Sequence, residues 1–433
     1  MAPSSVGRTL TAASAVLTLA ATAGCGGFGG GGDSPGGTGA TAWALTGGSE
    51  EAFRTSFESW NEANPDRRIS VEWFANDAYK EKIRTAVGAG NAPTLVFNWS
   101  GGTLADYAES GQVEDLSGQV DSVTDKLLPS VAANGEIDGS VYAVPNNQAQ
   151  PVVLYYNEQV LEEAGVEPPE SFADMMEAVD ALKDEDVVPI ALAGQSVWPE
   201  LMWIQYLTDR VGGPEAFQRI LDGEEGAWSD PAVIEAATAI SDLVEAGAFG
   251  DNYASVDADS GADTALLHTG KAGMLLQGSW VYPNMIEDAP EFVEDGLGYT
   301  TFPVVEDGSG DPSNIVGNPA NFWSVSSDAS EEDRDTAIDY INDQVYNEEN
   351  VQSLLDLGAV PPVTGLEEQI AAQDDPDHLE FTYSMVRDAE HFQLSWDQAL
   401  PPDQAQELLS NLDLLFLGEL TPEEFGAAMD STL

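Results

Sequence analysis

The sequence predicts an α/β protein with two or more domains, and three observations support this prediction. From residue 41 onward, short apolar runs alternate with amphipathic stretches, the order typical of a sheet covered by helices. About 390 residues follow a glycine-rich segment at 25–40, and this length exceeds one ordinary domain. Apolar residues make up 42 % of the chain, which is enough to fill the cores of such domains.

The N-terminal region is expected to alternate strands with helices. Strands are predicted at 41–47, 68–74 and 94–99, the second from its apolar alternation and the third from a continuous apolar run. Helices are predicted between and after them, at 49–65, 77–90 and 103–111. Because this order is typical of a parallel sheet, ligands are expected at the loops beyond the strand ends, here 46–50 and 98–102.

Helices dominate the second region, which begins after residue 157. Amphipathic patterns at 171–182, 199–210 and 231–247 predict helices. Strands are predicted at 272–277 and 298–305, and the C-terminal third is predicted to be mostly helical.

The only cysteine, Cys25, lies between an apolar run and a glycine tract. One cysteine excludes an internal disulfide and a cysteine-rich zinc site. The apolar run is too short to span a membrane and fits a secretory signal. The stretch "TAGC" at 22–25 resembles a bacterial lipobox, although Thr22 departs from the aliphatic residue that is usual there. The resemblance implies a lipoprotein signal peptide at 1–24, lipidation at Cys25 and a tether at 25–40. The protein would then sit on the extracellular face of the cell membrane; a plain secretory signal is the alternative.

Acidic residues outnumber basic ones by 76 to 14, which gives a net charge of −62 spread along the whole chain. Such a charge repels itself at low salt and is largely screened near about 1 M salt. Two interpretations stay open: an acidic exported protein, or halophilic adaptation to a saline medium. Nucleic acid and anionic ligands are not expected as partners, because no basic patch is present.

Several motifs together resemble one family. The stretches are "FESWNEANPD" at 57–66, "VYAVPNNQAQPVVLYYN" at 141–157 and "HTGKAGMLLQGSW" at 268–280. In their order and spacing they are similar to extracellular solute-binding proteins of ABC-type sugar importers, the maltose-binding-protein-like group. The resemblance covers roughly residues 41–430.

This resemblance implies a two-lobed, periplasmic-binding-protein-like fold of type II, with hinge crossings between the lobes and a ligand cleft between them. The first lobe is expected at 41–149 and 303–345, and the second at 150–302 and 346–433. The resemblance also implies a monomer that captures a sugar, expected to be an oligosaccharide, and delivers it to the transmembrane subunits of an ABC permease without catalysis.

A neutral sugar needs flat aromatic faces to stack on, and amides or carboxylates to bond its hydroxyls. Trp280 follows the predicted strand at 272–277 and also matches the family's stacking tryptophan. Most of the other candidates are tryptophans and amides at predicted loop ends or at the crossover near 146. The candidate ligand-binding residues are Trp280, Trp396, Asp397, Asn98, Trp99, Asn146, Asn147, Gln148, Trp198, Trp323, Gln195 and Glu50.

The sequence predicts neither a metal nor a cofactor. His268, His378 and His391 lie far apart and lack metal-ligand spacing, and no nucleophile elbow is present. Two alternatives to a sugar carrier stay open. One is a secreted carbohydrate-active enzyme with two carboxylates at the scissile bond. The other is a carrier for a cation such as a betaine or polyamine, held in a tryptophan cage; the amides near 146 favour a sugar instead.

Overall fold

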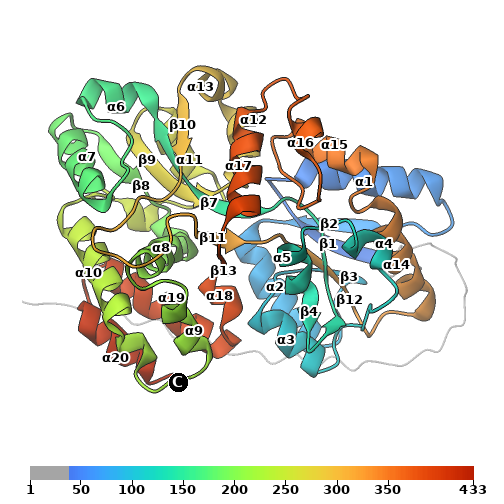
Figure 1. Cartoon of the computed structure of the whole chain (residues 1–433). Coiled ribbons are helices and arrows are strands. Elements are labelled where there is room, and N and C mark those ends of the chain that lie inside the picture. Colours follow the sequence, from blue (N-terminus) through green and yellow to red (C-terminus); the bar gives the residue numbers. More distant parts are fainter. Residues whose placement is uncertain (1–38) are drawn as a thin grey trace, which may run out of the picture. The chain divides into compact units, whose positions relative to one another are not determined.

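Two large β-sheets organise residues 39–433, which are the residues that the computed structural model describes (Figure 1). Each sheet has its own hydrophobic core, so the described chain has two lobes. The predicted signal peptide, the lipidation site Cys25 and almost all of the predicted tether lie outside the described residues. Within 39–433, no helix combines the length and the apolarity that crossing a membrane requires.

The first sheet has the order β2-β1-β3-β12-β6. β1 pairs in parallel with β2 and β3, whereas β12 is antiparallel to both β3 and β6. The predicted βαβαβα order is confirmed. The strands are β1 (Thr41–Leu45), β2 (Ser70–Phe74), β3 (Leu95–Asn98), β6 (Val144–Pro145) and β12 (Phe322–Val325), and the first three helices are α1 (Glu50–Ala63), α2 (Asn76–Gly88) and α3 (Gly102–Glu109).

The second sheet has the order β13-β11-β7-β9-β8, and β10 pairs with part of β7. β7 is antiparallel to β9, β10 and β11, and β8 runs parallel to β9. The strands are β7 (Gln150–Asn157), β8 (Val188–Ala191), β9 (Ala272–Gly278), β10 (Leu297–Thr300), β11 (Ile315–Asn318) and β13 (Phe392–Leu394).

Helices cover the second sheet, as the amphipathic patterns predict. α7 (Phe172–Asp184) begins with a capping box, in which Ser171 and Asp174 each accept a hydrogen bond from the other's backbone N–H. α8 (Leu201–Gly212) is buried along most of its length, and α10 (Pro231–Glu245) packs against it. The other helices of this lobe are α6 (Glu158–Ala164), α9 (Glu215–Leu221), α11 (Ala262–His268), α12 (Val281–Asp288), α13 (Pro290–Asp295), α18 (Trp396–Ala399), α19 (Pro402–Phe416) and α20 (Pro422–Asp430).

The segment 303–318, expected in the first lobe, belongs to the second. Its strand β11 pairs with β7 on one side and with β13 on the other. The buried guanidinium of Arg210 in α8 also donates hydrogen bonds to the carbonyls of Asp311, Pro312 and Asn314. The chain returns to the first lobe only after β11, at β12.

The segment 346–371, expected in the second lobe, packs in the first. α15 (Glu348–Asp356) lies beside α1 (Figure 1) and buries Val351 and Leu354 in the first core. The same lobe holds α4 (Asp121–Thr124), α5 (Pro129–Ala132), α14 (Glu331–Gln344), α16 (Glu367–Ile370) and the short hairpin of β4 (Glu136–Ile137) and β5 (Ser140–Val141).

α17 (Asp377–Asp388) joins the two lobes. Leu379 and Tyr383 pack in the first core, whereas Met385 and Val386 pack in a cluster against the second sheet. The chain also crosses between the lobes at 146–149, between β6 and β7, and at 319–321, between β11 and β12. These short crossings place the residues that flank them at the junction of the two lobes.

Candidate functional site

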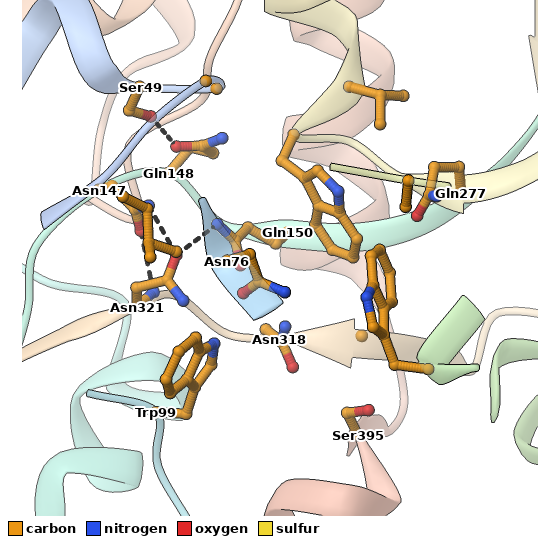
Figure 2. Close-up of a pocket in the computed structure, with 18 of the residues that line it drawn as sticks. Ser49, Asn76, Trp99, Asn147, Gln148, Gln150, Gln277, Asn318, Asn321 and Ser395 are labelled. Atoms are coloured by element: carbon orange, nitrogen blue, oxygen red, sulfur yellow. Dashed lines mark hydrogen bonds between the residues drawn. The ribbon is translucent and has the colours of Figure 1, made fainter. Parts of the chain in front are cut away.

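A cavity of about 210 Å³ lies between the two lobes, and residues of both lobes line it. On the first lobe the lining comes from the segments that follow β1, β2 and β3, and the sequence predicts the first and the third of these. On the second lobe it comes from the end of β9 and the start of α12, from Trp198 and α8, from the loop before α11, and from the segment around α18. The start of β7 and the end of β11 complete the lining where the chain crosses between the lobes (Figure 2).

Trp280 lines this cavity just after β9. Its indole folds back over Gly278: a Cβ added at Gly278 would lie only 1.8 Å from the Trp280 ring. Glycine at this position is therefore what allows the ring to lie against the end of the strand. The ring centroids of Trp280 and Trp198 are 5.9 Å apart, so the two indoles form one aromatic wall on the second lobe.

A strained backbone precedes Trp198. Val197 has a φ of 61°, a value that a β-branched residue rarely adopts and that costs about 1–3 kcal/mol. The short 3₁₀ turn that follows carries Trp198 to the cavity. Because this conformation lowers the stability of the fold, its role is better explained by the placement of Trp198 at the cavity.

Trp99 supplies the aromatic surface of the first lobe (Figure 2). It follows β3, and its backbone N–H donates a 2.8 Å hydrogen bond to Oδ1 of Asn98. Its ring packs against Tyr79 and Phe97, with centroids 5.9 and 6.0 Å away. The ring is therefore braced on one side and presents the rest of its surface to the cavity.

Amide side chains gather at the base of the cavity, where the chain crosses between the lobes (Figure 2). Oδ1 of Asn321 accepts hydrogen bonds of 2.8 Å from both Asn147 and Gln150. Gln148 accepts from the hydroxyl of Ser49 through Oε1. These bonds fix the orientation of the amides before any ligand enters.

Part of this amide capacity has no partner in the protein. Nε2 of Gln148 and Oδ1 of Asn318 are buried and lack hydrogen-bond partners within the described residues. A buried polar atom without a partner is costly, so such atoms need an explanation. Both residues line the cavity. A hydroxyl group of a ligand could accept a hydrogen bond from Nε2 of Gln148, and another could donate one to Oδ1 of Asn318.

Two hydrogen bonds cross the cleft to backbone amides of the first lobe. The N–H of Gly48 donates to Oδ1 of Asn284 at 2.8 Å, and the N–H of Asp77 donates to Oδ2 of Asp259 at 2.9 Å. Asp77 lies in the first turn of α2, whose N-cap residue Ala75 has no side-chain acceptor. Asp259 of the second lobe therefore fills the capping role for this helix.

Three charged side chains line the cavity: Lys80, Asp259 and Asp397. Nζ of Lys80 lies 3.8 Å from Oδ2 of Asp397, and 5.5 and 5.9 Å from the ring centroids of Trp99 and Trp198. Partial burial raises the pKa of Asp259, while the hydrogen bond from the Asp77 N–H opposes that rise. Each charge is thus already engaged with other groups of the protein.

The structure brings six of the twelve predicted residues to the cavity: Trp280, Trp198, Trp99, Asn147, Gln148 and Asp397. Trp323 does not line it, because its indole is buried in the first core against Phe53 and Phe97. Trp396 does not line it either, because it stacks on Phe217 inside the second core.

The other four predicted residues serve elsewhere or lie outside the lining. Asn98 is buried and holds the Trp99 backbone, and Asn146 is buried at the start of the 146–149 crossing without lining the cavity. Glu50 pairs with Arg54 within α1. Gln195 is exposed and away from the lining.

Sequence reasoning missed most of the polar lining. The missed residues are Thr46, Ser49, Asn76, Lys80, Gln150, Gln205, Asp259, Gln277, Asn284, Asn318, Asn321, Ser395 and Gln398. An available signal was the stretch "GNPAN" at 317–321, which places two amides around a short crossing. The remaining residues come from distant segments, and their convergence is visible only in the fold.

Nothing in the described part of the chain groups three or more metal-ligating side chains. His378 is buried and stacked on Tyr282, with ring centroids 3.5 Å apart, and burial lowers its pKa to about 3. It lies in α17 between the lobes and does not line the cavity. The site therefore consists of aromatic faces, amides and a few engaged charges.

The fold and the cleft between its lobes define a two-lobed solute-binding protein. The chain belongs to the family described as bacterial extracellular solute-binding protein, whose model matches residues 32–342. This assignment confirms the resemblance and the fold class predicted from the sequence.

Two relatives illustrate the family. The xylose/arabinose-binding protein XacG of Haloferax volcanii is 30 % identical over 259 residues, which cover 55 % of this chain and 52 % of that protein. An ABC transporter extracellular-binding protein of Pyrococcus horikoshii is 25 % identical over 244 residues, covering 55 % and 54 %. The chain thus spans about half the length of the curated relatives it matches.

Solved structures share the fold over nearly the whole described chain. One, reported in work on xylan utilization by Caldanaerobius polysaccharolyticus, has a TM-score of 0.82 and 27 % identity, and covers 91 % of this chain and 100 % of its own. The GacH receptor of Streptomyces glaucescens, solved unliganded and with acarbose, has a TM-score of 0.75 and 20 % identity over 91 % and 97 %. The second likeness shows the fold alone.

Proposed function

We propose that this protein is the extracellular substrate-binding component of an ABC importer, and that it captures a neutral sugar between its lobes. The observation that carries the proposal is the lining of the cleft. Indoles of both lobes, Trp99 on one and Trp198 with Trp280 on the other, face a cavity whose base is built from amides. Indoles suit the flat C–H faces of a sugar, and amides suit its hydroxyl groups.

The relatives support the same ligand class. The Haloferax volcanii relative is named for binding xylose and arabinose. The Caldanaerobius polysaccharolyticus structure comes from work on xylan utilization. The cavity of about 210 Å³ is smaller than the ~300–1,000 Å³ typical of ligand pockets. We therefore favour a saccharide of one or two rings over the longer oligosaccharide expected from the sequence.

An enzyme is the less favoured alternative. Glycoside hydrolysis needs two carboxyl groups that flank the scissile bond, one of them free to protonate it. The two carboxylates of the cavity are engaged: Asp259 accepts from the Asp77 N–H, and Asp397 accepts from the Ser395 hydroxyl at 2.8 Å and pairs with Lys80. This arrangement supports binding without turnover.

A cationic ligand is also less favoured. A betaine or polyamine would need the open faces of the tryptophans for its charge. The ammonium group of Lys80 already lies near the rings of Trp99 and Trp198. A second cation there would meet like charge as well as occupied faces.

Delivery to a permease and anchoring at Cys25 complete the proposal. A lipidated Cys25 would hold the folded lobes at the outer surface of the cell membrane. Stable anchoring would need two or more acyl chains. The transmembrane subunits of the importer are the partner that the family membership suggests.

The test is incubation of the purified protein with radiolabelled mono- and oligosaccharides, followed by equilibrium dialysis and chromatography of the sugars. We expect saturable retention of at least one neutral sugar, recovered unchanged. Shortened products would instead support the enzyme, and retention of betaine or spermidine alone would support the cation carrier.

A further inference from the structure

Two consecutive glycines at the start of α3 lie directly against α18 of the opposite lobe. A Cβ added at Gly102 would stand 2.2 Å from the carbonyl oxygen of Leu400 and 2.7 Å from its carbonyl carbon. A Cβ added at Gly101 would stand 2.2 Å from the carbonyl oxygen of Gln398. Cβ atoms do not approach backbone this closely, so only glycine permits the contact.

The two sides of this contact belong to different lobes. α3 is fixed to the first lobe by Leu104 and Tyr107, which are buried among its hydrophobic clusters. α18 is fixed to the second lobe by Trp396 and Leu400, which are buried in the second core. The contact therefore exists only when the lobes are together, and two-lobed binding proteins open and close by hinge motion.

Neither side can give way. The carbonyl of Leu400 precedes Pro401 and Pro402, whose rings fix the backbone φ. Leu400 itself is only 1 % exposed, and Leu104 is fully buried. An added methyl group at the contact would have to be accommodated by separating the lobes.

Gly102 is not required by the local fold of its own lobe. Gly101 has a φ of 78°, which favours glycine, but Gly102 does not have a positive φ. Gly102 is the first residue of α3, where alanine is a better helix former than glycine. Glycine is therefore needed at position 102 only when the lobes are in contact.

The contact also adjoins the ligand cavity. Trp99 precedes the glycine pair by two residues, and Asp397 and Gln398 belong to α18; all three line the cavity. Full approach of α3 to α18 thus brings lining residues of both lobes to the same ligand.

We propose that Gly102 is a positioning residue that sets how far the lobes close on the ligand. The inference rests on the proposed function, because it concerns closure around that ligand. Without a side chain, Gly102 lets the carbonyl of Leu400 reach the start of α3. With a methyl group there, the lobes would stop short and the ligand would escape sooner.

The test compares Gly102→Ala with a matched control, Gly88→Ala. Gly88 ends α2 in the same lobe, and a Cβ there would meet no atom within 4 Å. For Gly102→Ala we expect sugar affinity to fall about tenfold or more, as for overpacking against rigid backbone. The loss should appear as faster dissociation with an unchanged association rate. Small-angle scattering of the sugar-saturated variant should give a larger radius of gyration than the wild type.

The sugar-free melting temperature separates closure from folding. We expect neither Gly102→Ala nor Gly88→Ala to melt below the wild type without sugar. A sugar-free Gly102→Ala that is unfolded or strongly destabilised would overturn the inference, since the contact would then belong to the fold. Equal affinity of Gly102→Ala and wild type would overturn it as well. If the wild type binds no neutral sugar, the proposed function fails, and the closure inference fails with it.

Discussion

The backbone N–H of Asp77 in one lobe donates a 2.9 Å hydrogen bond to Oδ2 of Asp259 in the other. Because α2 has no cap of its own, the bond stabilises the helix and the closed lobes together. Asp259→Ala should therefore weaken sugar affinity several-fold, since loss of a capping group costs about 1 kcal/mol. Calorimetric titration checks this.

The controls for this change are Asp259→Asn, which keeps an acceptor oxygen, and Asp251→Ala, an exposed acidic residue of the same lobe. We expect Asp259→Asn to retain most of the affinity and Asp251→Ala to retain all of it. An Asp259→Ala variant that binds as tightly as Asp251→Ala would show that the cap does not contribute to closure.

Two buried or half-buried tryptophans should respond in opposite ways to truncation. Trp280→Ala should weaken sugar binding by more than about tenfold with little change in melting temperature, as for a stacking residue at a central contact. Trp323→Ala should cost about 3–5 kcal/mol of folding stability, because its indole fills the first core. Calorimetry and thermal denaturation of both variants test the pair. A Trp280→Ala variant with unchanged affinity, or an unfolded one, would remove Trp280 from the site.

Glu200 should make the protein less stable as the pH rises. It is fully buried, and neither carboxylate oxygen has a hydrogen-bond partner among residues 39–433. Burial, and next the charge of Asp413, raises the pKa of Glu200 from 4.5 to about 9. The folded state then holds a proton that the unfolded state releases between these two values, so the free energy of unfolding falls with rising pH across that window.

Glu200→Gln removes this titration. The melting temperature of the variant should fall less than that of the wild type between pH 5 and 9, about the window set by the two pKa values. The exposed Glu225→Gln is the control and should follow the wild type. Identical pH profiles for wild type and Glu200→Gln would contradict a raised pKa at Glu200.

The net charge of −62 should make stability depend on salt. Folding confines like charges, and salt screens them until the Debye length reaches about 3 Å near 1 M. The melting temperature should climb steeply between about 0.05 and 1 M NaCl and then level off. Sugar affinity should change much less, because indole stacking and amide hydrogen bonds carry no net charge. A melting temperature that does not respond to salt, or an affinity that collapses with it, would count against this.

Cys25→Ser should release the protein from the membrane fraction and leave its sugar affinity unchanged. The prediction follows from the lipobox-like stretch at 22–25. A lipid anchor there would be attached through the thiol of Cys25, which serine lacks. Fractionation of cells that express each form measures it. A variant that stays with the membranes after high-salt washing would show that lipidation of Cys25 is not the anchor.

The sequence predicted those site residues whose position follows from a pattern in the neighbouring residues. Trp280 and Trp99 each closely follow a buried strand and lie near glycine, and that pattern places a side chain at the edge of a sheet. The prediction that Trp323 lines the site was wrong because β12 is buried on both faces. The glycine and amide residues just before Trp323 had suggested a loop. The prediction for Trp396 was wrong because its indole stacks on Phe217, which lies 179 positions earlier in the sequence. Only the fold brings these two residues together.

The amide network and the lobe boundaries could not be predicted for a related reason. Gln150 and Asn321 share a hydrogen bond across 171 positions, and no local pattern shows that the two side chains meet. β11 and β12 are both short apolar strands, only three residues apart, yet they pair in different sheets. Periodicity identifies a strand but carries no information on which sheet it joins.

The most direct test of the central claim is calorimetric titration of the wild type and Trp280→Ala with one panel of ligands. The panel contains neutral pentoses and hexoses, their di- and tetrasaccharides, and betaine and spermidine. We predict single-site binding of at least one mono- or disaccharide to the wild type, weakened more than about tenfold in Trp280→Ala, and no binding of the cations. Binding of a cation without any neutral sugar, or sugar binding that Trp280→Ala leaves unchanged, would contradict a neutral-sugar site between the lobes.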